Sequence, residues 1–187
     1  MYTYLKLDPI HDLRIFSRQE FQRLLQLSPA RAKYFLEAYC KKGTFIRLKK
    51  GLYVSKDHYP SQAEIANRLY QPSYISFEYA LQLHGLIPES AYTITSATTK
   101  LTRVFTIGGV SYSFSSLNKN LFNGYFPSQQ NGVAVLLAEP EKALADYLYL
   151  VTLGKKAPLE RLSIDKLDKT KLKFYEKVFD RPLLRMI

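Results

Sequence analysis

Four ionisable residues near the start of one predicted helix come closest to a catalytic constellation: Glu139, Glu141, Lys142 and Asp146. Carboxylates beside a lysine could hold a metal ion and polarise a phosphate, as nucleases require. The same residues also suit the start of a helix, because negative charge there is stabilised by up to about 1 kcal/mol. Glu141 and Lys142 are adjacent and therefore point in different directions. We expect a structural role for this group and no enzymatic activity.

Other side chains that could perform catalysis or bind metal are scattered along the chain. The histidines His11, His58 and His84 lie in different segments, and none is near the single cysteine, Cys40. No pair has the spacing of zinc ligands. The Gly108-Gly109 pair lies inside a predicted hairpin, whereas a phosphate-binding loop would join a strand to a helix. The sequence therefore predicts no metal site and no cofactor.

Positive charge is concentrated towards the two ends of the chain, whose formal net charge is +11. Residues 1–60 carry 12 Lys and Arg against 5 Asp and Glu, residues 61–154 carry 5 against 6, and residues 155–187 carry 10 against 5. A basic patch on a fold that can enter a groove favours nucleic acid as the partner. A lysine-rich helix face near the C-terminus indicates less, because such faces are usually solvated surface.

The basic residues of the first segment fall on a predicted helix and the hairpin after it. Ser28 followed by Pro29 is typical of a helix start. Apolar residues then repeat at helical spacing, and Lys41-Lys42-Gly43 predicts the helix end. Two strands follow, joined by a turn at Lys49-Lys50-Gly51. An earlier helix, opened by the capping box Ser17-x-x-Glu20, completes the order of a winged helix-turn-helix.

Both exposed elements of this unit, the second helix and the wing, carry side chains that could contact DNA. Lysines at a turn are also common solubilising residues, and winged helices also bind proteins. Basic residues on both elements of one motif favour double-stranded operator DNA as the partner. The predicted DNA-binding residues are Ser28, Arg31, Lys33, Tyr34, Lys41, Arg47, Lys49 and Lys50.

The rest of the chain predicts a second domain that mixes helices and strands. Capping signals at Ser61 and Ser76 begin two helices, and the Gly108-Gly109 pair predicts a tight hairpin turn. Helices are predicted at residues 61–69, 77–84, 141–151 and 168–179, strands at residues 92–96 and 133–138, and a hairpin at residues 103–114. We therefore predict an α+β fold, with a winged helix-turn-helix over residues 1–58 and a small α+β domain with an antiparallel sheet over residues 59–187.

Four blocks of sequence occur in a recognisable order: residues 46–54, 72–87, 95–99 and 141–146. Together they resemble the AbiEi antitoxins of abortive-infection toxin–antitoxin systems. The resemblance implies an N-terminal winged helix that represses its own operon. It also implies a C-terminal domain that counters a cognate toxin resembling a nucleotidyltransferase. Antitoxins of this kind usually continue well beyond the point equivalent to Ile187, so a regulator without the antitoxin role is a second expectation.

The sequence predicts a cytoplasmic protein that does not enter a membrane. No apolar stretch approaches the roughly 20 residues of a membrane span, and residues 1–6 lack the apolar core of a signal peptide. A lone Cys40 suits a reducing compartment. Two functions remain open: a DNA-binding repressor, and an interaction protein that binds a partner through its C-terminal domain with no specific DNA role.

Overall fold

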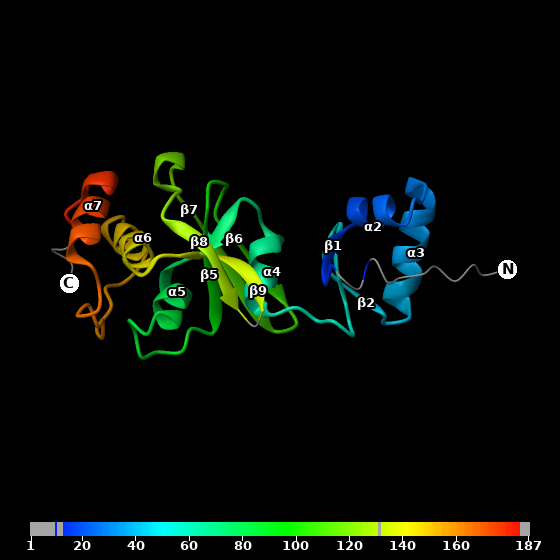
Figure 1. The fold of residues 1–187 in the computed structure, drawn as a ribbon, viewed down its shortest axis with the longest axis horizontal. Helices are drawn as coiled ribbons and strands as arrows, with labels where there is room; N and C mark the ends of the chain where they lie inside the picture. Colours follow the sequence, from blue (N-terminus) through cyan, green and yellow to red (C-terminus); the bar gives the residue numbers. More distant parts are fainter. Residues whose placement is uncertain (1–9, 11–12, 131, 184–187) are drawn as a thin grey trace. The chain divides into compact units, whose positions relative to one another are not determined.

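The computed structural model describes residue 10 and residues 13–130 and 132–183, and the predicted α+β class is confirmed (Figure 1). The described residues hold six α-helices, one three-stranded sheet and one six-stranded sheet. Contacts divide the chain into two compact units, Met1–Leu69 and Tyr70–Ile187. The sequence placed the boundary within residues 56–61, before helix α4 (Gln62–Leu69), and the contact division includes α4 in the first unit.

The first unit contains a small antiparallel sheet and two helices that follow one another closely. Its elements before α4 are β1 (Ile15–Ser17), α2 (Arg18–Leu24), α3 (Pro29–Lys41), β2 (Phe45–Lys49) and β3 (Leu52–Ser55). Strand β3 lies between β1 and β2 and is antiparallel to both. The predicted capping box at Ser17 is present: the Glu20 N–H donates to the Ser17 hydroxyl at 3.1 Å, and the Ser17 N–H donates to the Glu20 carboxylate at 2.6 Å.

Aromatic side chains from the helices and strands form the core of the first unit. Phe16, Phe21 and Phe45 are at most 1% exposed, and the rings of Phe16 and Phe45 meet edge to face with centroids 4.9 Å apart. Leu36 of α3 joins the same cluster. Leu24 of α2 is not part of this cluster, because it is 40% exposed.

The second unit is built on one six-stranded sheet with the strand order β6-β7-β5-β4-β9-β8. Helix α5 packs on β5 and on α6, and α6 packs on α7. The elements are β4 (Ser73–Ile75), α5 (Phe77–Leu83), β5 (Thr93–Thr98), β6 (Arg103–Ile107), β7 (Val110–Ser116), a 3-10 turn η1 (Lys119–Leu121), β8 (Tyr125–Gln130), β9 (Val133–Ala138), α6 (Pro140–Thr152) and α7 (Lys169–Phe179).

The prediction of an antiparallel sheet in the second unit is wrong, because the sheet is mixed. The two hairpins β6–β7 and β8–β9 are antiparallel, and Phe105 faces Tyr112 across the first of them. However, β7 pairs with β5 and β9 pairs with β4 in parallel. The two central strands of the sheet are β5 and β4. In each hairpin the second strand, β7 or β9, pairs with one of these central strands and runs in the same direction. The sequence predicted local hairpins but held no signal for these long-range pairings.

The role of Ser76 also differs from the prediction. Its side chain makes no capping hydrogen bond to α5. Its hydroxyl donates instead to the Asp146 carboxylate at 2.7 Å, which links the end of β4 to α6. A sequence signal for a helix cap therefore marks a contact between two distant segments.

Candidate nucleic-acid interface

Helix α3 begins where its sequence requires. Ser28 is extended (φ −67°, ψ 156°), and its hydroxyl accepts a hydrogen bond from the Arg31 N–H at 3.4 Å, as an N-cap residue does. Pro29 occupies the first helical position, and its carbonyl accepts from the Arg18 guanidinium at 2.9 Å. The exposed Ser28, a predicted DNA contact, thus has a structural task at the start of α3.

The buried face of α3 determines which side chains point outward. Leu36 is 1% exposed and marks that face. Because successive helical residues turn by about 100°, Tyr34 and Lys41 lie opposite the buried stripe, while Arg31 and Lys33 lie at its two borders. All four are exposed, Tyr34 to 55%. The helix therefore presents three cations and a phenol to solvent.

The cations of α3 make only weak contacts with their neighbours. Lys33 lies 4.0 Å from the Glu37 carboxylate, and both side chains are more than 60% exposed. An exposed pair of this kind contributes roughly 0.3–0.5 kcal/mol. The Arg31 guanidinium lies over the Phe35 ring, 5.9 Å from its centroid. Neither contact prevents these side chains from meeting a phosphate.

The hairpin after α3 places its three basic residues in different surroundings. Arg47 and Lys50 are exposed, and the Arg47 side chain donates to the Lys49 carbonyl at 3.3 Å. Lys49 is half-buried, and its ammonium donates to the backbone carbonyl of Leu69 at the end of α4. The hairpin therefore offers Arg47 and Lys50 to a ligand more readily than Lys49.

Two ion pairs attach α4 to the rest of the first unit. The Arg68 guanidinium donates to both Glu20 carboxylate oxygens, at 2.9 and 2.8 Å. Arg14 lies 3.5 Å from the Glu64 carboxylate. Burial alone would raise the pKa of Glu20, but hydrogen bonds from the Ser17 N–H and from Arg68 outweigh it and lower the pKa. The sequence did not predict this ion pair, because 48 residues separate Glu20 from Arg68 and no local pattern indicates it.

The arrangement suits a phosphate backbone. Helix α3 packs against β2, so its exposed face and the hairpin belong to one compact structure. Guanidinium and ammonium groups form charge-assisted hydrogen bonds with phosphate oxygens, and a tyrosine hydroxyl can add another. The exposed cations on these two elements are Arg31, Lys33, Lys41, Arg47 and Lys50.

No protein-family model matches this sequence, and no curated protein matches it. The side chains themselves therefore carry the functional interpretation. In the part of the chain that the structure describes, no group of three or more His, Cys, Asp and Glu residues could hold a metal ion. Within the same residues, no helix has the length and apolar character needed to cross a bilayer.

The residues first considered for catalysis include a buried ion pair. Lys142 and Asp146 lie one turn apart on α6, pair with each other, and are both fully buried. The Asp146 carboxylate also accepts from the Tyr74 hydroxyl at 2.8 Å and from Ser76. Burial raises the pKa of Asp146 and lowers that of Lys142, and their mutual attraction opposes both shifts. This group links α6 to β4 inside the second unit.

Glu139 and Glu141 hold the start of α7 against the start of α6. Glu139 is the N-cap residue of α6, and Glu141 lies in its first turn. The Glu141 carboxylate accepts from the Asp168 N–H at 2.9 Å, and Glu139 pairs with Lys171 at 3.1 Å. The helix-start position predicted for both carboxylates is confirmed, and each also anchors a second helix.

Two of the three histidines and the single cysteine lie within the described residues. His58 is exposed, and His84 makes a hydrogen bond of 2.8 Å with the Ala138 carbonyl. Cys40 is half-buried, and burial raises the pKa of its thiol although the charge of Arg47 opposes the shift. His11 and residues 1–6 lie outside the described residues.

Proposed function

We propose that the chain is a DNA-binding transcriptional regulator that contacts duplex DNA with α3 and the β2–β3 hairpin. The observation that carries the proposal is that these two successive elements both present exposed basic side chains. In this interpretation the first unit is a winged helix-turn-helix, with α3 as the recognition helix and the hairpin as the wing. The position of β3 between β1 and β2 supports it.

Helix α3 and the hairpin have different tasks in this proposal. Arg31 and Tyr34 lie in the N-terminal half of α3, the part of a recognition helix that meets base edges. Arg47 and Lys50 contact phosphates, which position the protein but read no sequence. Repression of its own operon, implied by the resemblance to AbiEi antitoxins, is the biological role that we propose.

The test is binding of the full chain to a duplex from the region upstream of its own gene. Fluorescence anisotropy over a range of salt concentrations should give an affinity at least about 10³-fold higher than for a scrambled duplex. The logarithm of the binding constant should fall linearly with the logarithm of the salt concentration. A protein-interaction module without a specific DNA role would bind both duplexes equally, and that result would reject the proposal.

A further inference from the structure

Among the described residues, strand β6 forms one edge of the six-stranded sheet and pairs only with β7. The two-residue turn at Gly108-Gly109 makes Ile107 and Val110 a hydrogen-bonded pair, and such pairs recur at every second residue. In β7, the N–H of every second residue from Val110 onwards therefore points towards β6. The Ser116 N–H agrees with this pattern, because it donates to the Thr102 hydroxyl at 3.1 Å. The N–H and C=O groups of Val104 and Thr106 therefore point away from the sheet.

Strand β6 carries neither of the two residue types that commonly block strand addition at a sheet edge. Exposed edges are commonly blocked by proline, lysine or a covering segment. The opposite edge strand, β8, has Pro127 near its centre, and proline has no N–H to offer. Strand β6 contains neither proline nor lysine. Val104 is 59% exposed, and Leu101 just before the strand is 84% exposed.

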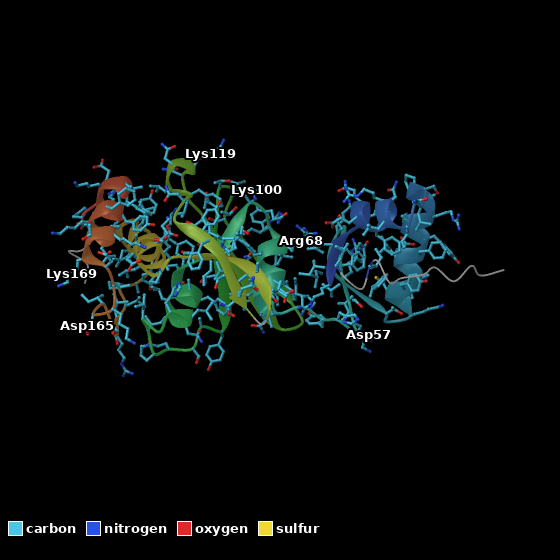
Figure 2. All side chains as sticks on the ribbon, viewed as in Figure 1. Asp57, Arg68, Lys100, Lys119, Asp165 and Lys169 are labelled. Atoms are coloured by element: carbon cyan, nitrogen blue, oxygen red, sulfur yellow. The ribbon has the colours of Figure 1, made fainter. Side chains whose placement is uncertain are left out.

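The stretch of sequence that contains β6 is basic and carries no acidic residue. Residues 90–138 contain no Asp or Glu. They contain three basic residues, Lys100, Arg103 and Lys119. Lys100 and Arg103 lie at the start of β6, and Lys119 follows β7, whose last residues lie beside that start (Figure 2). The Lys100 ammonium and the Arg103 guanidinium lie over the Tyr70 ring, 5.4 and 5.9 Å from its centroid. Among the described residues no carboxylate lies within ion-pair distance of either cation.

We propose that β6 is the docking site for an extended acidic segment of a partner protein, which adds to the sheet as a further strand. Backbone hydrogen bonds with Val104 and Thr106 provide affinity, and carboxylates of the segment pair with Lys100 and Arg103. A second copy of this chain fits less well, because each copy carries a net charge of +11. The site belongs to the second unit and is independent of DNA binding by the first.

The test uses the full chain and a fluorescent synthetic peptide about eight residues long, in which valine and glutamate alternate. The comparison peptides are its lysine counterpart and the glutamate peptide with alternate backbone nitrogens methylated. We expect the glutamate peptide to bind at least about tenfold more tightly than either comparison peptide. Equal binding of the acidic and basic peptides, or no binding of the acidic one, would overturn the proposal.

Matched variants assign the binding to the β6 edge. Thr106→Pro removes an outward N–H without removing a β6–β7 hydrogen bond and should abolish peptide binding, whereas Thr106→Val should preserve it. Lys100→Gln with Arg103→Gln should weaken binding and reduce its salt dependence. Near-ultraviolet circular dichroism and DNA binding should be unchanged in all of them. Peptide binding that survives in folded Thr106→Pro would overturn the proposal, and so would a dimer of the wild-type chain that this substitution dissociates.

Discussion

The basic side chains of the first unit differ in whether they already have a hydrogen-bond partner within the protein. Lys49 and Lys50 are adjacent at the hairpin turn, and the sequence predicts both as DNA contacts. The structure distinguishes them, because the Lys49 ammonium donates to the Leu69 carbonyl while Lys50 is exposed. No local sequence pattern could have shown this difference, because the acceptor lies 20 residues further along the chain, at the end of α4.

Lys50→Gln should weaken binding to every duplex and reduce the salt slope by about one. Lys49→Gln should change the slope by less, because its ammonium already has a carbonyl partner, and should lower the thermal midpoint instead. Anisotropy titrations at several salt concentrations and thermal melts of both variants measure these effects. A larger loss of slope for Lys49→Gln than for Lys50→Gln would contradict the assignment.

The Glu20 carboxylate should make the first unit sensitive to acid. Its pKa in the folded state lies below the ordinary value of 4.5, so it contributes stability above that pH and loses it as the pH falls through the folded pKa. Glu20→Gln should therefore be less stable at pH 7, and the difference should shrink below pH 4.5. Urea unfolding between pH 7 and pH 3 measures it, with Glu37→Gln on the exposed face of α3 as the control. A difference that stays constant over this range would remove Glu20 as the cause.

Elements were predicted well wherever their ends carry local signals. The Ser17, Ser28 and Ser61 caps all occur as the sequence indicates. Strands β1 and β4, of three residues each, and strand β8 were missed. Such short segments show no clear alternation. Strands β1 and β4 are held by pairing with distant strands, and such distant pairing is also why the parallel pairs of the larger sheet could not be predicted.

Helix α3 depends on Leu36 for its attachment to the core. Leu36→Ala should destabilise the chain by about 2–5 kcal/mol, because it leaves a cavity among Phe16, Phe21 and Phe45. Leu24→Ala is the control, because Leu24 is 40% exposed and its loss should cost roughly 0.5 kcal/mol or less. Urea unfolding of the two variants gives both values. Similar losses would mean that the buried faces of α2 and α3 are misassigned.

Helix α6 is joined to β4 and α7 by the buried Lys142–Asp146 pair. The Lys142 ammonium lies 4.6 Å from the centroid of the Phe179 ring, and Asp146 accepts from Tyr74. Asp146→Asn leaves Lys142 buried without a counter-charge and should cost about 3–5 kcal/mol. Combining it with Lys142→Met removes that charge and should recover part of the loss. A double-mutant cycle of unfolding free energies tests the coupling, and strictly additive losses would show that none exists.

Basic residues occur in both units, so the proposed position of the DNA site needs a test at the scale of the whole molecule. Residues 1–69 carry 13 Lys and Arg against 6 Asp and Glu, and residues 70–187 carry 14 against 10. The second group includes Lys169, Lys173 and Lys177, which are exposed on successive turns of α7. Figure 2 labels Lys169. Long-range attraction would treat all these cations alike, whereas a docked interface would depend on those at the DNA surface.

Two triple variants with the same change in net charge separate these possibilities. Arg31→Gln, Arg47→Gln and Lys50→Gln together should reduce the salt slope by up to about three, because each removes a phosphate or base contact. Lys169→Gln, Lys173→Gln and Lys177→Gln should change it by less than about one, because α7 lies outside the proposed interface. Anisotropy titrations with the same duplex measure both slopes. Equal losses would indicate attraction by net charge alone, and a larger loss for the α7 variant would move the DNA site to the second unit.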